Sequence, residues 1–170
     1  RRGLERGVGH DLKMTERARR ELKVIEETKN GPITVRTLTA DLRALGVRPG
    51  MVLLVHCSLS SLGWVCGGPA AVILVLQRLL RPYGTLVMPT HSGELSDPQN
   101  WRHPPVPEEW WDEIRANMPP YDPQLTPSRV GAVAECFRGQ TEVLRSSHPQ
   151  VSFAAWGAEA FRVVAEHSLE

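Results

Sequence analysis

The sequence has few cysteines, and their spacing excludes the usual metal and disulfide patterns. Three cysteines occur in 170 residues, at Cys57, Cys66 and Cys136, and no two of them form a CxxC pair. An odd number at this spacing suits neither the disulfide framework of a small secreted domain nor a zinc site. We therefore expect a protein of the reducing cytoplasm that needs no bound metal.

Charge of one sign and long apolar runs are also lacking. Twenty Lys and Arg residues against nineteen Asp and Glu residues leave a formal net charge of +1, and the basic N-terminal residues are interleaved with glutamates, as on a solvated helix face. A nucleic-acid-binding domain usually carries a basic stripe, so no nucleic-acid partner is expected. No apolar run approaches the roughly 20 residues of a membrane-spanning helix, and no signal peptide is recognisable, so no membrane partner is expected either.

The pattern that is present indicates a single α/β domain. Residues 51–56 and 85–91 are apolar runs of strand length, and residues 69–80 between them form an almost wholly apolar helix that begins with proline. A strand, a buried helix and a second strand make a βαβ unit, which predicts parallel pairing. Because residues 51–56 are continuously apolar, we expect this first strand to be buried on both faces.

Further elements are predicted from caps, prolines and composition. Thr37 or Thr39 is expected to cap the helix over residues 38–46, and Thr126-Pro127 to start the helix over residues 128–138. The other predicted helices cover residues 15–29, 108–117 and 158–167, and the other predicted strands cover residues 142–147 and 151–157.

Two stretches differ in composition from the rest. Residues 1–13 lack apolar periodicity and are interpreted as an extension before Met14, which leaves residues 14–170 for the domain. Residues 92–127 carry most of the prolines, three of the five tryptophans and many acidic residues. A long proline-rich connection is usually functional or disordered, and the tryptophans favour an ordered, functional insertion.

The stretch VHCSLSSLGWVCGGPAAVILVL, residues 55–76, joins the first strand to the apolar helix through serines and glycines. A helix N-terminus attracts anions, the serine hydroxyls add hydrogen-bond donors, and Gly67 and Gly68 allow a phosphate to approach the backbone. No lysine follows the glycines as in a nucleotide P-loop, and G-x-S-x-G is absent. This junction alone is compatible with a cradle for a phosphorylated cofactor and equally with a loop that only caps the helix.

Four residues near predicted strand ends or turns have side chains suited to catalysis. His56 and Cys57 point to opposite faces of a strand, so their adjacency does not make a Cys–His pair, and Cys57 is expected to be a small packing residue. His148 could act as a general base or be a turn histidine with a backbone hydrogen bond, which is the commoner case. Asp122 precedes a proline and is on local grounds a turn aspartate.

Five stretches, in this order, resemble the signature blocks of a known family. They are HCSLSSLGWVCGG, MPTHS, DPQNWRHPPVPEEWW, MPPYDPQLTPSRVGAVAECFR and RSSHPQVSFAAWG. From about Leu38 onward the chain resembles the aminoglycoside 3-N-acetyltransferases, antibiotic N-acetyltransferases whose fold differs from that of the GNAT acetyltransferases. The fold expected is a central mixed, partly parallel sheet flanked by helices. Chains of this family continue beyond HSLE, so the C-terminal part is expected to be missing.

The resemblance implies transfer of an acetyl group from acetyl-CoA to the 3-amino group of a 2-deoxystreptamine aminoglycoside, which confers antibiotic resistance. His148 is implied to be the general base of a direct transfer, with His56 and Asp122 as supporting residues. The residues expected to bind acetyl-CoA are Ser58, Leu59, Ser60, Ser61, Gly67, Gly68, Thr126, Ser128 and Val130. A homodimer is possible, and the sequence leaves the oligomeric state open.

Aminoglycosides are polycations, so the implied acceptor cleft should be acidic. Trp101, Trp110 and Trp111 could wall it, although tryptophans are more often core or interface residues. The acidic residues crowded into the insertion are Glu94, Asp97, Glu108, Glu109, Asp112, Glu113 and Asp122. They could equally serve only to solvate a helix and loops.

Two other functions stay open from the sequence. Cys57 stands where the family commonly has Ser or Thr, and Cys57 or Ser58 could serve a covalent acyl-transfer enzyme or a hydrolase. The other alternative is an inactive CoA-binding fragment, because missing strands would leave an open sheet edge and exposed apolar surface.

Overall fold

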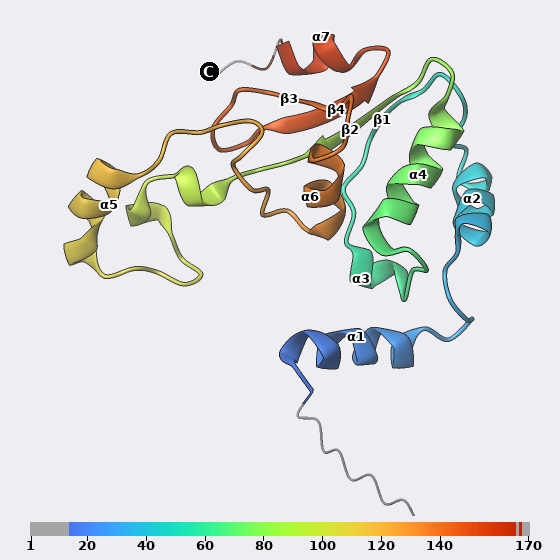
Figure 1. Cartoon of the computed structure of the whole chain (residues 1–170), viewed down its shortest axis with the longest axis horizontal. Helices are drawn as coiled ribbons and strands as arrows, with labels where there is room; N and C mark the ends of the chain where they lie inside the picture. Colours follow the sequence, from blue (N-terminus) through green and yellow to red (C-terminus); the bar gives the residue numbers. More distant parts are fainter. Residues whose placement is uncertain (1–13, 166, 168–170) are drawn as a thin grey trace, which may run out of the picture.

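The chain forms a four-stranded sheet with helices packed on both of its faces (Figure 1). The computed structural model describes residues 14–165 and 167, and the extension predicted over residues 1–13 lies outside them. The α-helices are α1 (Glu16–Glu27), α2 (Val35–Ala44), α3 (Leu59–Leu62), α4 (Gly68–Leu80), α5 (Trp111–Asn117), α6 (Ala132–Arg138) and α7 (Ala160–Ala165). The strands are β1 (Val52–Leu54), β2 (Thr85–Pro89), β3 (Leu144–Arg145) and β4 (Phe153–Gly157). None of the described helices is long and apolar enough to cross a membrane.

The sheet is mixed and partly parallel. Its strand order is β1-β2-β4-β3, with β1 parallel to β2 and β4 antiparallel to both of its neighbours. Helix α4 connects the two parallel strands and so completes the predicted βαβ unit. The register pairs Leu54 with Val87, which brings the carboxyl ends of β1 and β2 to one edge of the sheet. The predicted α/β class and sheet type are confirmed.

Helix α4 is the centre of the main core. It begins with a proline in its first turn, where the missing N–H costs no helical hydrogen bond, and seven of its thirteen residues are buried. It packs against α2 and α6, and together with α6 it covers Leu86 and Met88 of β2, whereas Val87 faces α7 on the other side of the sheet. Each fully buried Leu or Ile side chain contributes roughly 2 kcal/mol to stability.

The close approach of β2 and β4 requires glycine at the end of β4. Gly157 pairs with Thr85 and has φ +109°. A Cβ atom at this position would lie 2.1 Å from the carbonyl oxygen of Gly84. Any side chain here would force the two backbones apart.

The prediction that the first strand is buried on both faces is wrong. Strand β1 has only three residues and lies at the edge of the sheet, where Val52 and Leu54 are 60% and 54% exposed. Strand β2, by contrast, is buried at all five residues. A short apolar run occurs in edge strands as well as in central ones, so composition could not distinguish the two positions.

Helix α2 begins earlier than predicted, because its N-cap is Thr34 rather than Thr37 or Thr39. The hydroxyl of Thr34 accepts a hydrogen bond from the Thr37 N–H at 3.2 Å, and the hydroxyl of Thr37 accepts one from the Thr34 N–H at 2.9 Å. This reciprocal pair is a capping box in which threonine takes the place usually held by Glu or Gln.

Helix α6 begins later than predicted. It starts at Ala132, after Gly131 with φ +119°, so Thr126-Pro127 does not begin a helix. Residues 126–130 are irregular, and the Arg129 N–H donates to the His91 carbonyl oxygen at 3.0 Å. This bond holds the segment against the chain that follows β2.

The segment from Ser92 to Pro127 forms an arm beside the sheet, with α5 on the side of the molecule away from α2 (Figure 1). Three 3₁₀ turns precede α5, at Gly93–Leu95, Pro98–Asn100 and Glu108–Trp110. The indole N–H of half-buried Trp101 donates to Ser96 Oγ at 3.0 Å, whereas Trp110 is 55% exposed. Trp101 is thus fixed within the arm, whereas Trp110 faces solvent.

Candidate active site

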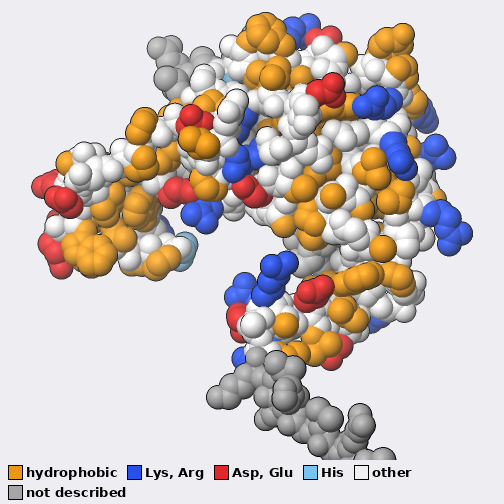
Figure 2. Space-filling view, in the orientation of Figure 1, with side chains coloured by type: hydrophobic (Ala, Val, Ile, Leu, Met, Phe, Trp, Pro, Cys, Tyr) orange, Lys and Arg blue, Asp and Glu red, His pale blue; other side chains and the backbone are white. Residues whose placement is uncertain are grey.

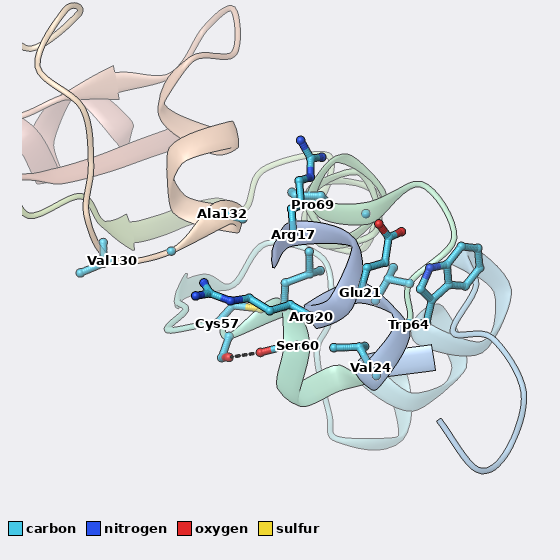
Figure 3. A pocket seen from close by; sticks show the side chains of 16 residues that line it. Arg17, Arg20, Glu21, Val24, Cys57, Ser60, Trp64, Pro69, Val130 and Ala132 are labelled. Atoms are coloured by element: carbon cyan, nitrogen blue, oxygen red, sulfur yellow. Dashed lines mark hydrogen bonds between the residues drawn. The ribbon is translucent and has the colours of Figure 1, made fainter. Parts of the chain in front are cut away.

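A cavity of about 630 Å³ opens beside the junction between β1 and α4 (Figure 3). Three segments enclose this junction cavity: helix α1, the junction itself, and residues 130–132 at the start of α6. In Figure 2 the molecule is hollowed between α1 and the sheet body. Open α/β sheets bind ligands at the carboxyl ends of their parallel strands, which is where this cavity lies.

The junction supplies most of the cavity wall. Helix α3 turns the chain after β1, and Gly67, with φ +84°, directs it into α4. No described side chain caps α4, so the positive end of its dipole stays open to an anionic ligand. The lining residues from the junction are Cys57, Ser58, Leu59, Ser60, Gly63, Trp64, Val65, Gly68 and Pro69.

Five of the nine residues predicted to bind a cofactor line the cavity, namely Ser58, Leu59, Ser60, Gly68 and Val130. The hydroxyl of Ser61 lies outside the lining but donates to Ser58 Oγ at 3.1 Å, and the hydroxyl oxygens of Ser58 and Ser60 are 3.4 Å apart. Gly67 acts through the backbone turn that begins α4. The serine stretch is therefore a connected set of hydroxyls at the cavity wall.

Thr126 and Ser128 do not line the cavity, and both hold the irregular segment in place instead. The Thr126 hydroxyl accepts a hydrogen bond from the Asp122 N–H at 2.9 Å. Buried Ser128 donates its N–H to the Glu135 carboxylate at 2.7 Å. Of these predicted residues in the TPSRV stretch, only Val130 reaches the cavity wall.

The Cys57 thiol lines the cavity but is not prepared to act as a nucleophile. Its half-buried side chain packs against the main core, and burial raises the pKa of the thiol. A catalytic thiolate needs a lowered pKa. This environment supports the interpretation of Cys57 as a packing residue.

A second cavity of about 390 Å³ adjoins the first one and includes His56. The two cavities share Cys57, Ser58 and Val130, and the second continues to Met88 and Pro89 at the end of β2. His56 is exposed at this boundary, and none of the hydrogen bonds found among the described residues involves its ring. Its ring is thus available to a ligand in the second cavity.

His148 is held by the backbone of the hairpin between β3 and β4. Its Nδ1 accepts hydrogen bonds from the N–H groups of Gln150 and Val151, at 3.2 Å and 3.1 Å. In the neutral ring the proton therefore resides on Nε2, which makes that nitrogen a donor. This is the arrangement of a turn histidine.

Two histidines that sequence reasoning missed gather beside His148. The rings of His148 and His167 stack with centroids 5.0 Å apart, and His91 makes an edge contact with Phe153 at 5.7 Å. Burial, together with the neighbouring histidines, lowers the pKa of His91, whose buried Nε2 has no partner among the described residues. We call His91, His148 and His167 the histidine cluster. Among residues 14–165 and 167, no group of three or more His, Cys, Asp or Glu side chains is arranged to hold a metal ion.

Residues 54–170 match the family model described as aminoglycoside 3-N-acetyltransferase. The chain belongs to this family. It is 50% identical over 151 residues to the SPbeta prophage-derived aminoglycoside N(3')-acetyltransferase-like protein YokD of Bacillus subtilis (strain 168). The crystal structure of YokD matches with a TM-score of 0.82, over 88% of this chain and 56% of that one.

Two further members of the aminoglycoside 3-N-acetyltransferase family are similar at lower identity. Aminoglycoside N(3)-acetyltransferase VII of Streptomyces paromomycinus is 35% identical over 151 residues, which are 86% of this chain and 50% of the relative. The structure of AAC-IIIb in a binary complex with CoASH matches at 33% identity with a TM-score of 0.68, over 82% of this chain and 51% of that one. The chain thus spans about half the length of the curated relatives it matches.

In this acetyltransferase-family chain, Asp122 serves a turn, as its local sequence predicts. Its Oδ1 accepts hydrogen bonds from the N–H groups of Gln124 and Leu125, at 2.7 Å and 2.8 Å. These two bonds shape the start of the irregular segment. None of the hydrogen bonds found for the Asp122 carboxylate among the described residues supports its predicted supporting role in catalysis.

An arginine that sequence reasoning missed joins the arm to the sheet edge. The Arg145 guanidinium donates to Thr90 O at 2.6 Å, to Ser92 Oγ at 2.8 Å and to Ser152 Oγ at 3.0 Å. It also donates to the carbonyl oxygen of Thr126 and stacks on Tyr121, with 5.2 Å from Cζ to the ring centroid. Nothing local in the sequence distinguishes Arg145 from a surface arginine.

The acids of the arm are partly neutralised by arginines. Arg115 bonds both Asp97 and Asp112 at 3.0 Å, and the hydrogen bond from Arg115 is the main cause that lowers the pKa of Asp97. Arg129 bonds Glu94 at 2.8 Å. The arm therefore offers a polycation less free negative charge than its composition indicates.

Proposed function

We propose that this chain carries the acetyl-CoA site of an enzyme that acetylates the 3-amino group of 2-deoxystreptamine aminoglycosides and so confers antibiotic resistance. The observation that carries the proposal is the junction cavity, where Ser58, Ser60 and Gly68 meet beside the uncapped start of α4. Family membership supports the reaction, and the relative AAC-IIIb has been solved with CoASH.

The cavity residues fit a long, phosphorylated thioester. Leu59, Val65 and Pro69 offer apolar contacts to an aliphatic chain, while the hydroxyls of Ser58 and Ser60 offer donors to phosphate oxygens. Acetyl-CoA would supply the acetyl group as a thioester. Backbone N–H groups of the junction are suited to stabilise the oxyanion that develops at the acetyl carbonyl.

An acceptor amine is protonated in water, so a base must remove a proton before or during the attack. The role of His148 as this base stays a prediction. The hydrogen bonds to its Nδ1 would have to break, or its Nε2 lose its proton, before the ring could accept a proton from the amine. A base needs a free lone pair, whereas Nδ1 of His148 is occupied and Nε2 carries the proton. The cavity geometry favours His56 for the same role, because His56 lines the second cavity next to Cys57 and Ser58, which line both cavities.

The first experiment measures thiol release from acetyl-CoA by the purified chain, with and without a panel of aminoglycosides. Release that depends on the aminoglycoside is the expected result. A calorimetric titration with CoA, run in parallel, measures binding separately from turnover. Absence of both release and binding would overturn the proposal.

The same samples distinguish the two alternative functions. A covalent mechanism on Cys57 or Ser58 predicts an acetylated protein by mass spectrometry, and the raised pKa of the Cys57 thiol argues against it. An inactive CoA-binding fragment predicts binding of CoA without thiol release to any amine. In that case a longer gene product, tested in the same assay, should restore release.

The possible homodimer and the predicted cytoplasmic location are parts of this proposal. Light scattering coupled to gel filtration measures the mass of the particle and tests the dimer. Acetyl-CoA as the donor is the chemical reason for expecting the enzyme inside the cell.

A further inference from the structure

Helix α1 is attached to the rest of the molecule mainly by polar contacts at its C-terminal end. No side chain within Glu16–Glu27 is buried, and Leu22 and Ile25 are 40% and 47% exposed. At its C-cap, the Thr28 hydroxyl accepts the Trp64 N–H at 2.9 Å and donates to the Val24 carbonyl at 2.6 Å. Hydrophobic burial therefore does not account for the position of α1.

One face of α1 nevertheless forms a wall of the junction cavity. Arg17, Arg20, Glu21 and Val24 line it, at the spacing that places residues on one side of a helix. In Figure 3 the Arg20 side chain extends toward Cys57, and the Arg17 side chain extends toward Pro69. Two guanidinium groups thus border the space beside the serine junction.

Among the residues that the structure describes, the cations that line this cavity come from α1 alone. Every lining residue that the structure places there from the junction and from residues 130–132 is uncharged. Arg20 donates through Nε to Glu16 at 3.1 Å, which leaves its terminal nitrogens for another acceptor. Of the described lining residues, Glu21 is the one that is acidic, so Arg17 and Arg20 leave an excess of positive charge on this helix face.

We propose that Arg17 and Arg20, which α1 holds at the cavity wall, bind the phosphate groups of CoA. The inference rests on the proposed function, because it names the residues that would hold the charged half of that ligand. Arginine presents a planar set of donors that matches phosphate oxygens. The serine hydroxyls and the start of α4 can hydrogen-bond phosphate but cannot neutralise its charge.

The test compares CoA with pantetheine, which lacks the phosphates, by calorimetric titration of the full chain. The double variant Arg17→Glu/Arg20→Glu is expected to bind CoA at least tenfold more weakly and pantetheine equally well. The matched control is Arg19→Glu/Lys23→Glu, which makes the same charge change on the same helix at positions outside the cavity lining. The control variant should weaken CoA binding by less than about threefold.

Three outcomes would overturn the inference. The first is unchanged CoA affinity in the Arg17→Glu/Arg20→Glu variant, and the second is an equal loss in the matched control. The third is an equal loss for pantetheine, which would mean that the substitutions damage the cavity itself. A wild-type chain that binds neither ligand would instead refute the proposed function, and the inference with it. Arg17→Lys/Arg20→Lys keeps the charge and should recover most of the affinity for CoA.

Discussion

The junction cavity and the histidine cluster lie beyond the same strand ends, but the chain assembles them in different ways. Nine lining residues of the cavity come from one continuous stretch, residues 57–69. The cluster joins His91, His148 and His167, which follow β2, the β3 strand and α7 respectively. A site built from one stretch can be recognised in a sequence, whereas a site built from three distant segments depends on strand order.

The two regions also differ in what holds them together. The cavity depends on backbone turns and short hydroxyl contacts, so single substitutions there should change binding more than stability. Beside the histidine cluster, Arg145 donates hydrogen bonds to Thr90 and Ser92, which flank His91 in the sequence, and to Ser152, and these three residues are buried. Substitutions on that side should change stability first.

The largest effect is expected from Arg145→Ala. The variant removes the donor to buried Ser92 Oγ, the donor to the Thr126 carbonyl and one of the two donors to the Thr90 carbonyl, and we expect a loss of about 3 kcal/mol in the free energy of unfolding. Urea denaturation measures it. Arg20→Ala, on the exposed cavity wall, is the control and should change stability by less than about 0.5 kcal/mol. Equal stability of the two variants would contradict the prediction that substitutions beside the histidine cluster affect stability more than substitutions at the cavity wall.

The next largest effect concerns turnover. His56→Ala is expected to lower aminoglycoside-dependent thiol release by about 100-fold or more, with CoA binding nearly unchanged. His148→Ala should lower it as well, and His148→Gln, which keeps an N–H donor near the position of Nε2, should recover most of it. If His148→Gln released no thiol while His56→Ala stayed active, the result would contradict His56 as the base and support His148 instead. Imidazole ¹⁵N spectra should show the neutral His148 ring protonated on Nε2.

A smaller effect is expected from pH. Burial lowers the pKa of His91, so the folded chain binds a proton at this ring less readily than the unfolded chain does. Stability that is present above pH 6.5 should therefore be lost as the pH falls below that value. Urea denaturation of the wild type at pH 7.5 and pH 5.5 measures the loss, and His91→Phe should reduce it. His167, whose pKa is also lowered by burial, should account for part of the remainder. An unchanged pH dependence in His91→Phe would contradict the assignment.

The smallest effect is expected from Cys57→Ala. Because burial raises the pKa of the thiol, Cys57 should stay protonated at neutral pH and react with iodoacetamide more slowly than the exposed Cys66. Thiol release from acetyl-CoA should stay within about twofold of the wild-type rate. Complete loss of thiol release in Cys57→Ala would contradict this prediction and support Cys57 as a covalent nucleophile.

The sequence predicted the βαβ unit because local signals agreed there. Pro69 marked the start of α4, and an apolar surface on all sides indicated a buried helix. The burial of β1 was predicted wrongly, because a three-residue edge strand has the same composition as a central one. The start of α6 was misplaced because a Thr-Pro pair resembles a cap, whereas here the pair lies in an irregular segment held by Asp122 and Glu135.

By itself the sequence determined the order of the helices and strands, the family, and the chemistry of the junction, because these depend on residues that are close along the chain. Only the tertiary structure decided that Arg17 and Arg20 face the junction cavity, that three histidines gather, and that Arg145 holds the arm. Those contacts join segments that lie apart along the chain: Arg145 is 55 residues from Thr90 and 19 residues from Thr126, and His148 and His167 lie on either side of β4. Their geometry follows from sheet order and register, which no local pattern specifies.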